Sequence, residues 1–76
     1  MGSVNSEFST ALAAVLKKHR LAKGLSQNQL SKLSGVSQTY VGEIERGLYS
    51  PTDDVSYALA NALEIPFSKL LWRYRE

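Results

Sequence analysis

The side chains best suited to recognising another molecule by hydrogen bonds gather between residues 37 and 46. At about 100° per residue, a short helix over this stretch turns Val41 and Ile44 to one side. The opposite side carries only small or polar residues, namely Gln38, Thr39, Gly42, Glu43 and Arg46. A glutamine amide donates and accepts at once, as a bidentate contact with adenine requires, and a threonine can bond a base or touch a thymine methyl. These residue types on one helix face favour the reading of base edges in the major groove of double-stranded DNA.

A second short helix is predicted directly before this one. Ser26 can cap its first turn, and Gln29, three residues later, can reach back to complete a capping box. The helix therefore begins at about Gln27, and Leu30 and Leu33 form its buried stripe.

A tight turn joins the two helices. Gly35 can adopt the left-handed conformation that stops the first of them, and apolar Val36 and a second cap, Ser37, follow immediately. Gly47 ends the second helix after about three turns. Residues 26–46 are therefore predicted to form a helix-turn-helix whose second helix is suited to lying in a groove.

The spacing of seven residues in this stretch resembles the Cro and phage-repressor type of helix-turn-helix family: Gln27, Leu30, Ser31, Gly35, Val36, Val41 and Ile44. The likeness covers about residues 12–71, including RLAKGLSQ before the motif and IERGLYSPT after it. Ser31 and His19 depart from the family, which usually has alanine and an aliphatic residue there. The resemblance implies an all-α, compact five-helix lambda-repressor-like bundle over residues 9–76. The start of the chain is weakly patterned, and we expect residues 1–8 to be a flexible segment.

Caps and apolar spacing predict the remaining three helices. The first runs from about Ser9 to Ala22, with an inward stripe of Leu12, Val15, Leu16 and His19. Thr52 caps the fourth, whose first turn holds two aspartates where the helix dipole favours negative charge. The inward residues of this fourth helix are Val55, Leu59 and Leu63. A fifth helix begins at Pro66.

Other residues in and beside the motif are placed to hold the DNA backbone. Gln27 lies where the unpaired N–H groups of a helix start favour a phosphate. Tyr40 and Arg46 can contact the backbone on either side of the groove, and the loop residues Tyr49 and Ser50 are further phosphate candidates. Such contacts position the protein on the duplex rather than specify a sequence.

Two residues of the base-reading face are open to a second interpretation. Glu43 could accept from a cytosine amino group, or its charge could repel wrong sites. Gly42 costs about 1 kcal/mol relative to alanine inside a helix. Close approach to DNA would offset this cost, as would a neighbouring side chain, such as Tyr40, that needs the room.

Arg20 and Glu45 occupy positions that resemble a partly buried ion pair of the family, linking the first helix to the end of the recognition helix. We assign this pair to structure. If it is buried, loss of one partner costs about 3–5 kcal/mol. If it lies at the surface, the pair contributes under about 1 kcal/mol.

The C-terminal helix has more aromatic surface than a monomer should need. A chain of 76 residues is marginally stable without a disulfide, a metal or a partner subunit, and this one has no cysteine. We therefore expect a homodimer whose contact includes Phe67, Leu71, Trp72 and Tyr74.

Charge and composition also favour a nucleic-acid partner. The net charge is only +2, but residues 17–46 carry six Lys or Arg and two Glu, a net charge of +4. One histidine, no cysteine and no convergent acid and base pair argue against an enzyme, a cofactor or a bound metal. No apolar run is long enough to span a membrane, so we expect a cytoplasmic protein, and no small-molecule effector is implied.

Together these features predict a sequence-specific transcriptional regulator that binds a palindromic operator as a homodimer, with half-sites about one helical turn apart. The stretch TYVGEIERG resembles restriction-modification controller proteins somewhat more than Cro-like phage regulators. An antitoxin-type regulator is a further alternative. A rival of another class is a protein-interaction module that keeps the fold and the dimer contact but does not bind DNA.

Overall fold

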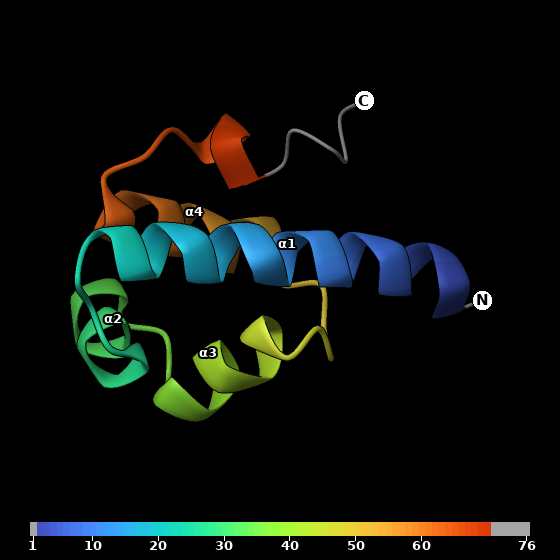
Figure 1. The fold of residues 1–76 in the computed structure, drawn as a ribbon, viewed down its shortest axis with the longest axis horizontal. Helices are drawn as coiled ribbons and strands as arrows, with labels where there is room; N and C mark the ends of the chain where they lie inside the picture. The colour runs from blue at the N-terminus through green and yellow to red at the C-terminus, as the bar shows by residue number, and fades with distance from the viewer. Residues whose placement is uncertain (1, 71–76) are drawn as a thin grey trace.

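Helix α1 (Gly2–Ala22) runs along the length of the molecule, and the other helices pack beside it (Figure 1). The computed structural model describes the backbone of residues 2–70 and the side chains of residues 9–70. Along the chain follow α2 (Gln27–Ser34), α3 (Gln38–Glu45), α4 (Asp53–Leu63) and a last helical segment at residues 67–70. Helix α3 packs against α1, and α2 packs against both α3 and α4. The predicted all-α, five-helix fold is confirmed.

Local capping chemistry sets the ends of the short helices, as the sequence predicts. The Ser26 hydroxyl accepts from the Gln29 backbone N–H, and the Gln29 side chain accepts from the Ser26 N–H, which completes the capping box of α2. Gly35 follows α2 in the left-handed conformation, with φ of 79°. Ser37 caps α3 and Thr52 caps α4 through backbone N–H groups three residues later.

One apolar core joins the inward faces of all these segments. It confirms most of the predicted inward residues and consists of Leu12, Leu16, Leu30, Val36, Val41, Ile44, Leu59, Ala60, Leu63 and Leu70. Val15 and Val55 are half-buried against it, and His19 is half-buried as well. Burial of this surface supplies the main favourable term in folding.

The predicted burial of Leu33 is wrong, because its side chain is 62% exposed. A step of three residues along a helix turns a side chain about 60° away from the first one. Leu30 is completely buried in the core, but the core does not extend far enough around α2 to cover Leu33.

The first helix begins earlier than predicted, at Gly2 rather than Ser9. Residues 2–8, which the sequence assigns to a flexible segment, are helical. The apolar periodicity that marks the helix starts only at Leu12, but nothing between residues 2 and 8 interrupts a helical backbone, since that stretch has no proline. Periodicity therefore located the packed part of α1 and not its first turns.

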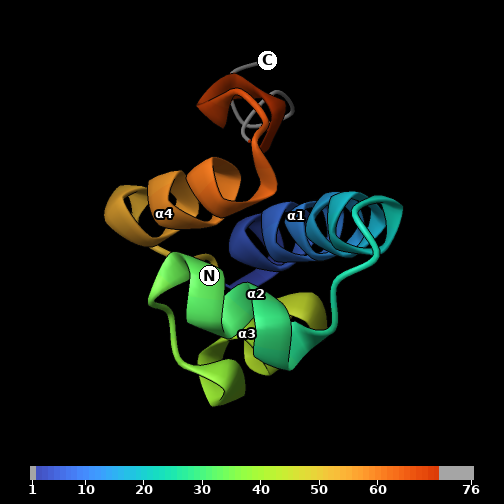
Figure 2. The ribbon, with the colours of Figure 1, turned by 90° about the vertical axis from the view of Figure 1, so that its left-hand side faces the viewer.

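The two views place α3 and the last helical segment on opposite sides of the α1 and α4 layer (Figures 1 and 2). Phe67, one of the predicted dimer residues, is half-buried and packs edge-on against Tyr57, with ring centroids 5.8 Å apart. The other three, Leu71, Trp72 and Tyr74, lie outside the described residues.

Candidate nucleic-acid interface

Helix α3 carries an outward face at the lower edge of both views (Figures 1 and 2). Its inward residues Val41 and Ile44 are completely buried, which fixes the rotation of the helix about its axis. Gln38 and Thr39, in the first turn, are exposed, as is Arg46 directly after the last. The two best predicted base readers are thus presented together at the N-terminal end of α3.

The centre of this face differs from the prediction. Gly42 is buried, whereas Gln38 and Thr39 are exposed, and its placement among the base-reading residues stays a prediction. A Cβ atom there would lie 3.3 Å from Oε1 of Gln27, so the glycine makes room for a neighbouring side chain. That neighbour is Gln27 of α2, whereas Tyr40 is the example given from the sequence. Glu43 is half-buried on the same helix.

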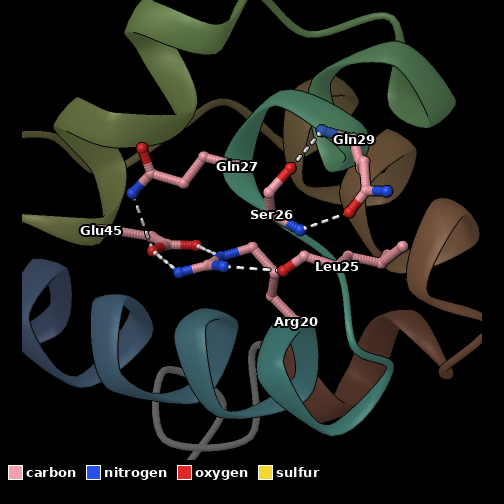
Figure 3. Close-up of polar contacts among 6 residues, drawn as sticks. All are labelled: Arg20, Leu25, Ser26, Gln27, Gln29 and Glu45. Carbon is pink, nitrogen blue, oxygen red and sulfur yellow. Dashed lines mark hydrogen bonds and ion pairs between the residues drawn. The ribbon is translucent and has the colours of Figure 1, made fainter.

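Arg20 of α1 and Glu45 of α3 form the predicted ion pair (Figure 3). Nε and Nη2 of Arg20 donate to the two carboxylate oxygens at 2.7 and 2.9 Å, and the two side chains are only 9% and 3% exposed. Nη1 donates to the carbonyl of Leu25 at 2.8 Å. The hydrogen bonds that Arg20 donates to Glu45 raise the pKa of Arg20, which secures the charged form of the guanidinium. One arginine thereby ties α1, the turn before α2 and the end of α3 together.

Gln27, the predicted phosphate contact at the start of α2, extends this arrangement. Its Nε2 donates to Oε1 of Glu45 at 3.1 Å, and the side chain is half-buried (Figure 3). A side-chain amide has two protons on its nitrogen, so one remains for another acceptor after the bond to Glu45. Gln27 therefore packs α2 onto α3 in addition to any contact it makes outside the protein.

Three other residues predicted to contact the DNA backbone, Tyr40, Tyr49 and Ser50, lie on α3 and in the loop after it. Tyr40 is half-buried against the core and meets the ring of Tyr49 edge-on, with centroids 6.0 Å apart. Tyr49 is 48% exposed. Ser50 is exposed, and its hydroxyl lies 2.7 Å from that of buried Ser9 on α1. These contacts attach the loop after α3 to the body of the domain.

Asn28 is a residue that the sequence reasoning missed. Its Nδ2 donates to Oε1 of Gln38 at 2.8 Å, which joins the first turn of α2 to the first residue of α3. Both side chains are exposed. A polar residue on the outer side of α2 gives no signal of this partner, because the two lie ten residues apart and meet only when the turn closes.

Part of the basic charge in residues 17–46 is paired within the protein. Arg20 is neutralised by Glu45, and Lys23 forms an exposed ion pair with Glu64, whose pKa is lowered by the lysine. Lys17, Lys18, Lys32 and Arg46 are exposed. Over the residues whose positions are described, no helix is long and apolar enough to cross a membrane. In the same part of the chain, no group of three or more His, Asp or Glu side chains could hold a metal ion.

Comparison with known proteins places this arrangement among transcription regulators. Residues 16–70 match the family model HTH_3, helix-turn-helix. The chain is 39% identical over 62 residues to the control protein C.SmaI of Serratia marcescens, covering 82% of this chain and 74% of that protein. The restriction-modification controller protein C.AhdI of Aeromonas hydrophila superposes with a TM-score of 0.79 at 39% identity, over 82% of this chain and 94% of that one.

A longer relative has the same domain. An HTH_3 family transcriptional regulator from Vibrio cholerae superposes with a TM-score of 0.85 at 36% identity, over 91% of this chain but only 39% of that one. The chain spans 34% of the length of the transcriptional regulator SutR of Escherichia coli and 74% of the length of C.SmaI. The family match covers most of the chain and contains the whole helix-turn-helix. The protein therefore belongs to the HTH_3 family of Cro and lambda-repressor type DNA-binding transcriptional regulators, which are not enzymes.

Proposed function

We propose that this protein regulates transcription by binding a palindromic operator as a homodimer, and that it is a restriction-modification controller. The single observation that supports DNA reading is the outer face of α3, where Gln38 and Thr39 are exposed. The inner side of this helix is held by buried Val41 and Ile44 and by the Arg20–Glu45 pair. Only the major groove admits such a helix and displays a distinct pattern for each base pair.

The contacts around this face have separate tasks in the proposal. Gln38 and Thr39 read base edges, and half-buried Glu43 excludes wrong sites by its charge. Phosphates are held by the remaining amide proton of Gln27, the Arg46 side chain, and the hydroxyls of Tyr40, Tyr49 and Ser50.

The controller assignment is supported by two relatives that the chain matches over most of their length. C.SmaI is called a control protein and C.AhdI a restriction-modification controller protein, and the chain covers 74% and 94% of them. A homodimer would place two copies of α3 on half-sites about one helical turn apart. We propose that its contact includes the helical segment at residues 67–70, which lies on the side of the molecule away from α3 and so leaves the reading face open.

The test is a selection of binding sites from randomised duplex DNA at near-physiological salt. The unaltered chain should enrich a palindrome, and a Gln38→Ala, Thr39→Ala variant should lose or change it. Asn61→Ala, at an exposed position on α4, is the matched control and should enrich the same site. Binding should weaken steeply as salt rises, because phosphate contacts release counterions. A folded dimer that enriches no sequence would reject this function in favour of a protein-interaction module.

A further inference from the structure

We propose that Ser9 of α1 is a positioning residue, which orients the Ser50 hydroxyl so that it donates to a phosphate of the operator. The proposal rests on the proposed function, in which Ser50 binds the DNA backbone, and adds to it a buried residue of another helix. Oγ of Ser9 lies 2.7 Å from Oγ of Ser50, although the two residues are 41 positions apart. Ser9 is 3% exposed, whereas Ser50 is exposed. The pair therefore connects the interior of the domain to the surface beside α3.

The direction of this bond decides whether Ser50 can bind a phosphate. A serine hydroxyl has one proton and two acceptor positions, whereas the oxygens of a DNA phosphate only accept. If Ser50 donates to Ser9, it has no proton left for the DNA. If Ser9 donates, the Ser50 oxygen accepts that bond and its own proton is free to point outward. Phosphate binding therefore selects the arrangement in which Ser9 is the donor, and the two consecutive bonds polarise and strengthen each other.

The loop that carries Ser50 is held against α1 at a second point. Gly47 has a φ of 77°, and a Cβ atom there would lie 3.7 Å from Cα of Thr10 and 3.9 Å from the carbonyl oxygen of Ser9. Pro51 is buried directly after Ser50, and a residue before proline is largely confined to extended conformations. Figure 1 shows this loop passing α1 between α3 and α4. The backbone of the loop is thus restrained, and Ser9 has only to orient the Ser50 side chain.

Such preorganisation is important at this loop because the loop carries no charge. Leu48, Tyr49 and Ser50 are neutral, so these residues can hold a phosphate only through hydrogen-bond donors. A donor that is already oriented loses less conformational entropy on binding, which raises affinity without a new contact. The effect should appear in the affinity for the operator and not in the preferred bases, because phosphate contacts carry no sequence information directly.

The experiment measures the affinity of the full chain for its selected operator by fluorescence anisotropy. Ser50→Ala should weaken binding about tenfold or more, because a hydrogen bond to a charged acceptor is lost. Ser9→Ala should weaken it about two- to tenfold. In a Ser50→Ala background, Ser9→Ala should cause no further loss. Ser9→Cys, which fills a similar volume but has a weak S–H donor, should bind with an affinity between those of the unaltered chain and Ser9→Ala.

A substitution in the DNA separates positioning from a structural role. Single methylphosphonate groups, each replacing one charged phosphate, are placed in turn along the operator. The phosphate that Ser50 binds is the one whose replacement weakens Ser50→Ala much less than it weakens the unaltered chain. At that phosphate alone, replacement should also weaken Ser9→Ala less than the unaltered chain. A general loss of fold or packing would not single out one phosphate.

Ser56→Ala is the matched control, because Ser56 of α4 is a buried serine, 1% exposed, that has no part in the proposed DNA contacts. It should keep both the operator affinity and the pattern of methylphosphonate effects. Circular dichroism at the assay temperature checks that each variant is folded.

The outcomes distinguish the two proposals. If the unaltered chain enriches no operator, the proposed function fails, and the role of Ser9 fails with it. If an operator is bound but either Ser9→Ala or Ser50→Ala binds it as tightly as the unaltered chain, the function stands and the role of Ser9 is refuted. Losses that add in the double variant would refute it as well.

Discussion

The Arg20–Glu45 pair predicts a large loss of stability from one truncation. Glu45 accepts two bonds from Arg20 and one from Gln27, and its side chain is 3% exposed. Glu45→Ala leaves the Arg20 guanidinium, itself 9% exposed, with only the Leu25 carbonyl as a partner. The breaking of a buried pair by removal of one charge costs about 3–5 kcal/mol.

That loss is comparable with the whole stability of a domain this small. At about 0.05–0.15 kcal/mol per residue, 76 residues give a free energy of unfolding of about 4–11 kcal/mol. With about 4–8 °C of Tm per kcal/mol, Glu45→Ala should lower Tm by about 12–40 °C. Thermal and urea unfolding followed by far-UV circular dichroism would measure both quantities, at one protein concentration because any dimer couples to unfolding.

An exposed ion pair provides a matched control. Lys23, directly after α1, pairs with Glu64, whose side chain is 76% exposed, so Glu64→Ala should leave Tm almost unchanged. An Arg20→Met, Glu45→Leu double variant removes both buried charges and should be more stable than Glu45→Ala alone. The reasoning would be refuted if Glu45→Ala lowered Tm no more than Glu64→Ala, or if the double variant lost as much as the sum of its two single changes.

Three further predictions concern the helix-turn-helix. Leu30→Ala should lower the free energy of unfolding by about 2–5 kcal/mol in urea denaturation, because Leu30 is fully buried. Leu33→Ala on the same helix should change it by less than about 0.5 kcal/mol. Equal losses would place Leu33 in the core. Gly42→Ala should stabilise the protein by about 1 kcal/mol in a Gln27→Ala background. In the unaltered chain the gain should be smaller, because the new Cβ meets the Gln27 side chain. Additive changes in a double-mutant cycle would contradict this contact. Ser37→Ala should cost about 1 kcal/mol by removing the α3 cap, as measured by thermal unfolding, and an unchanged Tm would show that the cap is not formed.

Local chemistry made the helix ends predictable from the sequence. A cap and its N–H partner are three residues apart, so Ser26, Ser37 and Thr52 each bond within a single turn, and Gly35 requires no partner to stop α2. The candidate base-reading residues could also be found from the sequence, because the spacing alone shows a polar helix face. Their contacts with DNA remain predictions.

The contacts that the sequence did not reveal depend on how the elements pack against one another. The neighbour of Gly42 is Gln27, fifteen residues earlier, and no periodicity within α3 indicates it. Leu33 has the spacing of a core residue, but the extent of the core around α2 is set by how α2 packs on α3 and α4. The bond between Asn28 and Gln38 likewise exists only because the turn brings two helix starts together.

The anchoring of α3 from its inner side has a consequence for how this protein could acquire a new target. Arg20, Val41, Ile44 and Glu45 hold the helix without using Gln38 or Thr39. Exchange of the two exposed residues leaves those supports untouched, and surface substitutions of this kind usually change stability by less than about 0.5 kcal/mol. The scaffold can therefore tolerate many other residue combinations at positions 38 and 39. New operators become accessible to engineering or to natural drift in few substitutions, and each intermediate sequence stays folded.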